Sequence, residues 1–290
     1  MSVTSFEIEG PSGPEKIEIR RPRNPREFKE LVKVQLETWE MSKTEIVGHR
    51  IIRAIADNGG VVLGAFTERG RAVGYSLAFL AEEGGKIFLY SHHTGVVPGY
   101  QGKGIGFRLK LAQREEALRR GIDLIKWTFD PIRAGNSYFN LTKLGVISNT
   151  FLMNYYGRMN DGLNRGMRSD RLKAEWYIRS PHVEKRIHGP INVERIVNWG
   201  EEVLRVEKVG DVEIPGEPIE FPHSDVVLIK IPENLEEVRK DRLAIESWRN
   251  AMAKAFMFYF SHGYWDACFL MPYHVLIRAK KEDILSGVIP

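Results

Sequence analysis

A glycine-rich run between a predicted strand and a predicted helix constrains the fold of this chain more than any other feature. From Thr94 to Gly106 it reads TGVVPGYQGKGIG. We expect the strand over Ile87 to Val96 and the helix over Gly104 to Arg120, with an apolar stripe at Ile105, Leu109, Ala112 and Leu118. The first turn of a helix leaves N–H groups unpaired at the positive end of the dipole, and glycines let an anion approach them. Since Lys103 adds a positive charge, the run predicts a phosphate-binding loop.

Spacing excludes two common phosphate-binding loops. A nucleoside-triphosphate loop has Lys and Ser or Thr directly after the second of two glycines five residues apart. Gly99 and Gly104 have that separation, but Ile105 follows them. A dinucleotide loop has the pattern Gly-x-Gly-x-x-Gly, whose last position is Phe107 or Leu109 in the two available registers. Neither class of loop fits.

The run resembles the acyl-coenzyme A loop of the GNAT acetyltransferases, Val-x-Pro-x-x-Gln/Arg-Gly-x-Gly-Ile/Val-Gly followed by a Leu three residues on. The matching residues are Val96, Pro98, Gln101, Gly102, Gly104, Ile105, Gly106 and Leu109. The resemblance implies that the strand before the loop splays from the next one, and that backbone groups of Val96 and Val97 bind the pantetheine arm and polarise a thioester. It also implies that the pyrophosphate of coenzyme A lies over Gln101, Gly102, Lys103, Gly104, Ile105 and Gly106.

The predicted order of elements is the one expected of the GNAT fold. From about Lys16 to Tyr177 it runs β-α-α-β-β-β-α-β-α-β, which indicates an α/β fold with a mixed sheet. Residues 140–145 resemble the second GNAT signature, Leu-Tyr-x-Lys-x-Gly-Phe. However, Leu141 occupies the position of the family's usual general-acid tyrosine. The resemblance therefore leaves the general acid undecided.

The length of 290 residues suits two domains. We expect a GNAT domain over residues 1–180 and a smaller C-terminal α/β extension over 181–290. Within the extension, Pro181 to Pro222 is predicted to be a linker followed by a hairpin, and the rest has a β-α-β-β pattern. That pattern fits either a degenerate half-GNAT unit or an extension that serves packing. The segment after Asn154 resembles an uncharacterised branch of predicted GNAT acetyltransferases with such an extension.

Side chains on the strand before the loop are the first candidates for catalysis. Acyl transfer to an amine needs a proton acceptor, and histidine has an ordinary pKa of ~6.5. Strict alternation places Tyr90, His92, Thr94 and Val96 on one face and Ser91, His93 and Gly95 on the other. The resemblance assigns the acid–base residue to His92 or Tyr90, four or six positions before the Val. Alternatively, His92 is a hydrogen-bonded polar residue of a half-buried strand, and we expect His93 to point to the core or to a helix layer.

Three further candidates follow the next strand. Asp130 ends that strand, where α/β sheets place ligands, and it either binds a substrate ammonium, accepts its proton or caps a turn. Asn136 either hydrogen-bonds to the pantetheine or caps its own helix. Tyr138 is the candidate general acid in place of the missing tyrosine.

Composition excludes several other classes of function. The net charge of +4 is too small to favour nucleic acid, although Arg158, Arg165, Arg168 and Arg171 keep that alternative open. No His/Cys cluster has metal-ligand spacing, and no signal peptide or membrane span is indicated. Cys268 is the only cysteine and is read as a buried apolar residue, so a cytoplasmic protein is expected. The glycine-, asparagine- and arginine-rich segment from Asn154 to Arg171 is either a surface loop or a lid over the substrate.

These features predict an acetyl-CoA-dependent N-acetyltransferase. The acetyl group would pass to the amine of a small-molecule or amino-acid-like acceptor by direct attack on the thioester, without a metal. A bulkier acyl donor, a protein acceptor and a non-catalytic acyl-CoA-binding module are the alternatives. A homodimer stays open, and the acceptor cannot be named because loops form its pocket in this fold.

Overall fold

The computed structural model describes residues 4–41, 44–157, 167–189, 198, 200–210, 212–221 and 224–287. The chain forms two compact units. Of the described residues, unit 1 contains those up to Trp127 and unit 2 those from Thr128 onward. Residues 158–166, the centre of the predicted lid or surface loop, lie outside the described residues, and so do Arg158 and Arg165.

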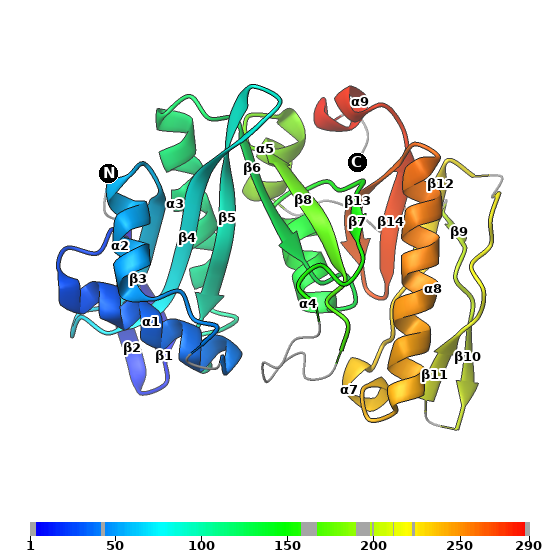
Figure 1. Cartoon of the computed structure of the whole chain (residues 1–290), viewed down its shortest axis with the longest axis horizontal. Coiled ribbons are helices and arrows are strands. Elements are labelled where there is room, and N and C mark those ends of the chain that lie inside the picture. Colours follow the sequence, from blue (N-terminus) through cyan, green and yellow to red (C-terminus); the bar gives the residue numbers. More distant parts are fainter. Residues whose placement is uncertain are drawn as a thin grey trace. The chain divides into compact units, whose positions relative to one another are not determined.

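Unit 1 is built on a mixed sheet (Figure 1). Its strands are β1 (Thr4–Gly10), β2 (Gly13–Arg20), β3 (Val61–Thr67), β4 (Ala72–Glu83), β5 (Lys86–Val96) and the part of β6 (Leu124–Phe129) up to Trp127. They lie in sequence order, with antiparallel neighbours from β1 to β5 and a parallel pair between β5 and β6. The predicted α/β class with a mixed sheet is confirmed, and β1 adds a hairpin that the sequence did not indicate.

Helices cover both faces of this sheet. They are α1 (Pro25–Trp39), α2 (His49–Asp57) and α3 (Ile105–Arg119). A Cβ atom on Gly64 would meet Leu31 of α1 at 3.0 Å, whereas one on Gly74 would meet Ile105 of α3 at 3.2 Å. Because Gly64 pairs with Tyr75, the neighbour of Gly74, the two helices lie on opposite faces. Strand β3 is consequently buried along its whole length.

Unit 2 contains a second sheet and several helices. Residues 128–188 form α4 (Ala134–Ser137), the π-helix η1 (Tyr138–Lys143), the antiparallel pair β7 (Phe151–Leu152) and β8 (Arg171–Tyr177), and α5 (Pro181–His188). The sheet has the order β13-β14-β12-β9, with β9 (Glu201–Glu202), β12 (Val226–Lys230), β13 (Tyr264–Leu270) and β14 (Tyr273–Arg278). The remaining elements are the hairpin β10 (Val206–Val209) and β11 (Val212–Pro215), with α7 (Leu235–Val238), α8 (Arg242–Ser261) and α9 (Lys281–Leu285).

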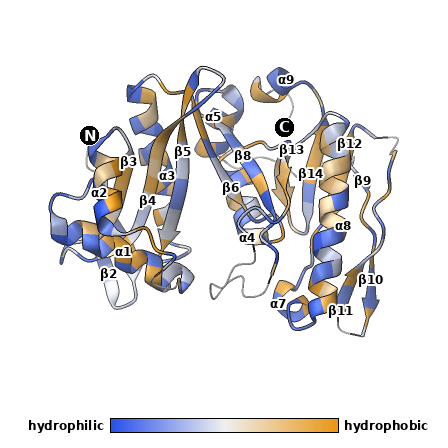
Figure 2. Ribbon diagram, viewed as in Figure 1, coloured by the Kyte–Doolittle hydropathy of each residue, from blue (hydrophilic) through white to orange (hydrophobic). Residues whose placement is uncertain are grey.

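The β-α-β-β pattern predicted for the C-terminal extension is confirmed. The predicted apolar face of α8 is buried, and Figure 2 shows hydrophobic and hydrophilic stretches alternating along that helix. Strand β13 also bonds to the segment before the extension, since Ser148 and Asp266 form a bridge with N–H···O distances of 2.8 and 3.0 Å. The Thr142 hydroxyl donates to the Phe269 carbonyl at 2.6 Å. Residues 128–157 are thus part of the same packed unit as the extension.

The predicted linker from Pro181 to Pro222 is only partly right. The hairpin is present as β10 and β11, but Pro181–His188 is the helix α5. The Ser180 hydroxyl accepts a hydrogen bond from the Val183 N–H at 3.3 Å, and Pro181 occupies the first turn. A serine cap followed by proline is a helix start, and the prolines and glycines beyond it concealed that signal.

Candidate functional site

The glycine loop turns through backbone conformations that favour glycine. Gly99, Gly102 and Gly104 have φ of 83°, 75° and 78°, in the left-handed region that side chains with a Cβ avoid. Gly104 is the N-cap of α3, and no side chain caps that helix. The predicted strand–turn–helix arrangement is therefore confirmed, with α3 beginning one residue after the predicted start.

The backbone amides of this loop have no acceptor within the described part of the chain. None of the N–H groups from Gln101 to Gly106 donates to a backbone or side-chain atom there. The first backbone bond of the helix runs from the Arg108 N–H to the Gly104 carbonyl at 3.1 Å. Six consecutive donors at a helix N-terminus can bind an anionic group such as a phosphate.

The end of β5 directs one backbone N–H away from its neighbour β4. The Val97 N–H donates to the Val73 carbonyl at 3.0 Å, so Val97 occupies a hydrogen-bonded position of the antiparallel ladder. Bonded and non-bonded positions alternate, which turns the N–H and carbonyl of Val96 to the opposite edge. There the Val96 carbonyl accepts from Gln101 Nε2 at 2.9 Å, and its N–H has no partner among the described residues. Val97 was expected to contribute too, but its N–H is already bonded within the sheet.

That opposite edge is open because β5 and β6 separate. Their register comprises only the pairs Leu89–Ile125 and Tyr90–Lys126, although β5 continues to Val96. Beyond Tyr90, β6 therefore forms no register with β5. The splay implied by the resemblance is present at this position.

A β-bulge places His92 differently from strict alternation. Leu77 of β4 pairs with His93 and Ala78 pairs with Ser91, so His92 is the extra residue of β5. The rings of His92 and His93 consequently stack, with centroids 4.0 Å apart, whereas the sequence predicted opposite faces. The aromatic side chains of Phe79 and Tyr90 lie close by, with centroids 5.3 Å apart.

The two histidines have different environments. The His93 Nδ1 accepts from the Tyr75 hydroxyl at 2.6 Å, and its ring lies 4.9 Å from that of Trp39, so His93 faces the core as predicted. Burial, with a smaller effect from His92, lowers the pKa of His93 to about 3. Burial also lowers the pKa of His92, but its ring nitrogens have no partner among the described residues. His92 is thus a neutral imidazole that is able to accept a proton.

Acid should destabilise the protein through its buried histidines. Burial holds the pKa of His93 and of His182 at about 3 in the folded state, against ~6.5 when unfolded. As pH falls below about 6.5, only the unfolded chain takes up these protons, so stability falls by about 1.4 kcal/mol per pH unit for each histidine. Urea unfolding from pH 7 to 5 should give a shallower slope for His93→Gln than for the wild type. The same slope in both would contradict the prediction, and the exposed His188→Gln is the control.

A row of buried polar side chains on α3 was missed by sequence reasoning. Lys110, Gln113 and Glu116 lie three residues apart on the face toward the sheet. Lys110 Nζ donates to Ser91 Oγ and Gln113 Oε1, both at 3.0 Å, and burial lowers its pKa well below the ordinary value. The Gln113 amide donates in turn to Ser76 Oγ at 2.8 Å. The three-residue spacing is the only sequence signal of this row, which fixes α3 to β4 and β5.

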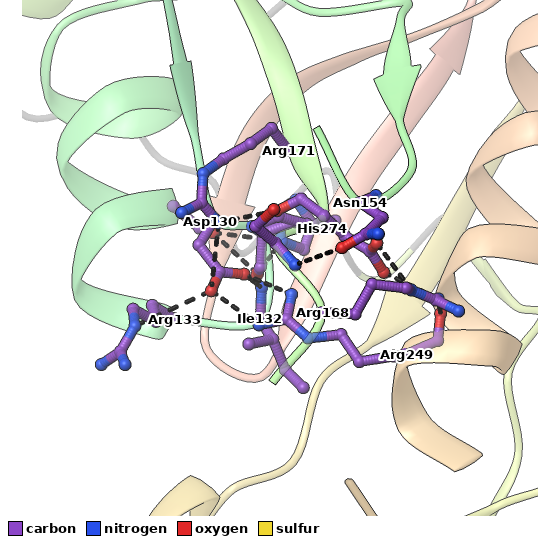
Figure 3. A network of polar contacts seen from close by, with 12 residues as sticks. Asp130, Ile132, Arg133, Asn154, Arg168, Arg171, Arg249 and His274 are labelled. Atoms are coloured by element: carbon purple, nitrogen blue, oxygen red, sulfur yellow. Dashed lines mark hydrogen bonds and ion pairs between the residues drawn. The ribbon is translucent and has the colours of Figure 1, made fainter. Parts of the chain in front are cut away.

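Asp130 lies in a buried cluster of arginines in unit 2 (Figure 3). It is 4% exposed, and its two oxygens accept from the two Nη atoms of Arg249, each at 2.7 Å. Arg171 and Arg133 lie 3.6 and 3.8 Å away. Burial alone would raise the pKa of Asp130, but the arginines, Arg249 above all, lower it overall. Its oxygen also accepts from the Ile132 N–H at 3.2 Å, which fits the turn-capping alternative.

The other predicted site residues of unit 2, Asn136 and Tyr138, follow Asp130 closely in the sequence. Asn136 is exposed within α4, whose N-cap is Arg133, so the alternative in which Asn136 caps its own helix is wrong. Tyr138 begins η1 and is 51% exposed, whereas Leu141 is fully buried. The glycine loop, Tyr90 and His92 belong to unit 1.

The described residues also bear on nucleic-acid binding, on the single cysteine, on metal binding and on membrane spans. Arg168 forms two hydrogen bonds with Asp170, both at 2.8 Å, and Arg171 is buried. Cys268 is fully buried as predicted, and burial raises the pKa of its thiol to about 11. Within the described ranges, no three His, Cys, Asp or Glu residues group as metal ligands. None of the helices found there combines the length and apolar character needed to cross a membrane.

The glycine loop lies within the part of the chain that matches a known protein family. Residues 25–136 match the model of the acetyltransferase (GNAT) family, and no curated protein matches the chain. Similar solved structures include a putative GNAT acetyltransferase from Desulfovibrio desulfuricans, at 18% identity and a TM-score of 0.44 over 56% of this chain and 99% of that one. The ribosomal-protein-S18-alanine N-acetyltransferase from Escherichia coli is 14% identical, with a TM-score of 0.45 over 56% and 94%. Ard1 from Thermoplasma volcanium is 15% identical, with a TM-score of 0.41 over 55% and 95%.

The family match spans α1 and α2, the strands from β3 to β6, the glycine loop and α3. These are the elements that position the six unpaired amides and the open edge of β5. Residues 25–136 of the chain therefore match the acetyltransferase (GNAT) family.

Proposed function

We propose that this protein transfers an acetyl group from acetyl-CoA to the amine of a small-molecule or amino-acid-like acceptor. In this reaction the amine nitrogen bonds to the thioester carbonyl carbon while the carbon–sulfur bond breaks. The amine gives up a proton, and the departing thiolate takes one. The observation that carries the proposal is the set of unpaired N–H groups from Gln101 to Gly106, beside the free N–H of Val96.

Coenzyme A fits the donor side of this arrangement. The six loop amides and the half-buried Lys103 would hold its pyrophosphate. The Val96 N–H would donate to the thioester oxygen, where negative charge develops during attack. The splay of β5 from β6 leaves that N–H accessible. We assign no donor role to Val97, because its N–H is bonded to Val73.

His92 is the proposed general base. It is neutral near pH 7, carries no competing hydrogen bond among the described residues, and precedes Val96 by four positions on the same strand. Tyr90, on the same strand, is the second candidate for this acid–base role. We keep Asp130 out of the acid–base steps because Arg249 holds both of its oxygens.

Tyr138 is retained as the proposed general acid. Leu141 has no proton to give and is fully buried, whereas the Tyr138 phenol is half exposed. The exposed Asn136, two residues earlier, is retained as a contact for the pantetheine arm. A cytoplasmic location is retained as an expectation, since the only cysteine is a buried thiol.

Release of free thiol from acetyl-CoA across a panel of amines tests the proposal. We expect turnover with small amines or amino acids, and slower release when a longer acyl-CoA replaces acetyl-CoA. Turnover with peptides alone would contradict the proposed acceptor class. Faster turnover with the longer donor would contradict acetyl-CoA as the donor.

Gly104→Ala should weaken the use of acetyl-CoA. Its φ of 78° is costly for alanine by about 1–2 kcal/mol, so the loop must turn its amides away from the anion. We expect KM for acetyl-CoA to rise about tenfold, with a smaller change in kcat. Gly121→Ala is the matched control, since Gly121 has a φ of 70° at the other end of α3 and nothing within 4 Å of a Cβ. Equal effects of the two substitutions would show a loss of stability instead of a loss of binding.

A further inference from the structure

Unit 2 contains a cavity of about 340 Å³ between the segment around β7 and β8 and the helix α8. Met167 and Ile245 supply part of an apolar wall. Polar side chains line the rest of it, among them Asn154, Arg168, Arg249 and Asn250. A cavity of this size with a few polar groups in an apolar wall is typical of small-molecule sites.

Arg249 lines this cavity and carries an unsatisfied donor. Its side chain is 4% exposed, and both of its Nη atoms bind Asp130. Its Nε is buried and has no hydrogen-bond partner. A buried guanidinium N–H without an acceptor costs free energy, which an oxygen atom of a ligand would recover.

The two asparagines present donors as well. The Asn250 Oδ1 accepts from Arg168 Nη1 at 2.8 Å, and because arginine has no acceptor, this contact fixes the orientation of the amide. The Asn154 Oδ1 accepts from the backbone N–H of Ser169 at 3.4 Å, which fixes that amide likewise. In both side chains the NH₂ group is left without a partner among the described residues.

Each of the other charged side chains of the wall has a partner of opposite charge. Arg168 is bonded to Asp170, to Asn250 and to the Arg249 carbonyl, and Arg249 is paired with Asp130. At the exposed rim, Arg242 Nε donates to Glu246 at 3.1 Å. The unpaired N–H donors of the wall belong to Arg249, Asn154 and Asn250, and one of them is part of a guanidinium. A guanidinium donor binds an ionised acceptor more strongly than a neutral one.

We propose that this cavity binds a small molecule through a single carboxylate. A carboxylate offers two oxygens and about four lone-pair sites for the three side-chain donors. A carboxylate brings one negative charge to these donors, whereas a phosphate dianion would bring two into a wall whose own charged side chains are paired. The residues of this site are separate from those of the glycine loop, so the site does not depend on the acyl-transfer proposal.

Benzoate and benzamide are matched probes, because they share shape and differ in charge and in one acceptor atom. Thermal unfolding of the full chain is measured against the concentration of each probe, up to about 20 mM, since a small ligand of this kind binds in the millimolar range. We expect benzoate to raise Tm saturably, and benzamide to bind at least about tenfold more weakly. The NMR resonance of the Arg249 Nε–H should shift along the same binding curve.

Asn250→Asp tests the site while keeping the hydrogen bond from Arg168 to residue 250. The substitution keeps the oxygen that accepts from Arg168 but replaces the NH₂ donor by a negatively charged acceptor, so benzoate should bind at least about tenfold more weakly. Asn154→Gly tolerates the φ of 49° at that position and removes a second donor. Asn149→Asp is the control, since its Oδ1 also accepts a hydrogen bond, from Thr150, but does not line the cavity.

Three outcomes would overturn the proposal. They are no benzoate binding at the highest concentration, equal binding of benzamide or inorganic phosphate, and unchanged affinity in Asn250→Asp and Asn154→Gly. A loss of thiol release from acetyl-CoA is not among them. The carboxylate site and the acyl-transfer reaction are thus tested separately.

Discussion

Asp130→Ala is expected to lower the free energy of unfolding by about 3–5 kcal/mol. The substitution leaves the buried guanidinium of Arg249 without the carboxylate that binds both of its Nη atoms. It also removes the negative charge near Arg133 and Arg171. Water cannot readily solvate a side chain that is 4% exposed, so the charge stays uncompensated. Urea unfolding followed by tryptophan fluorescence measures the change.

Asp225→Ala is the matched control for this prediction. Asp225 also pairs with an arginine, Arg278, but both side chains are more than half exposed. Solvent screens an exposed ion pair, so this variant should unfold almost as the wild type does. Asp130→Leu combined with Arg249→Met should recover part of the loss, because no charge is then left buried. Equal effects of Asp130→Ala and Asp225→Ala would refute the energetic role of the buried pair.

His92→Ala is expected to lower kcat about 100-fold, the usual contribution of a positioned general base. KM for acetyl-CoA should change little, because the loop amides and not the imidazole hold the pyrophosphate. Burial lowers the pKa of His92 below 6.5, so the enzyme should lose activity only below that pH, as His92 becomes protonated and unable to accept a proton. This acid limb should be absent from the residual activity of the variant.

Steady-state kinetics from pH 5 to 8 with one amine acceptor test both parts of the prediction. His49→Ala, which removes another histidine of unit 1 at the start of α2, is the control. An unchanged kcat in His92→Ala would exclude histidine from proton transfer, and Tyr90→Phe would then be the next variant. A rise in KM with unchanged kcat would assign His92 to binding.

The glycine loop and the mixed sheet were predictable because their signals are local. The turn glycines, the strand before them and the helix after them stand within about thirty residues of one another. The bulge at His92 was not predictable, since it arises from the register between β5 and β4, which no residue of β5 specifies alone. Alternation therefore placed His92 and His93 on opposite faces, whereas their rings stack.

The environment of Asp130 was missed for a related reason. Its principal partner, Arg249, lies 119 residues further along the chain, on the apolar face of α8. A single arginine within an apolar stripe gives no indication of the carboxylate that it meets. The unpaired donors of the cavity also depend on such distant contacts, and their positions follow from the tertiary structure alone.

The long separations within unit 2 affect how the protein forms during synthesis. Three residues are synthesised more than a hundred residues before the partners that they contact. These pairs are Thr142 with Phe269, Ser148 with Asp266 and Asp130 with Arg249. A ribosome adds about 5–20 residues per second, so the segment after β6 spends about ten seconds outside the tunnel before its partners exist. Throughout that interval the carboxylate of Asp130 is hydrated by water. A nascent chain that ends near residue 180 would expose the apolar side chains that β13 and α8 later cover, which makes that stage the one most prone to aggregation and most in need of a chaperone.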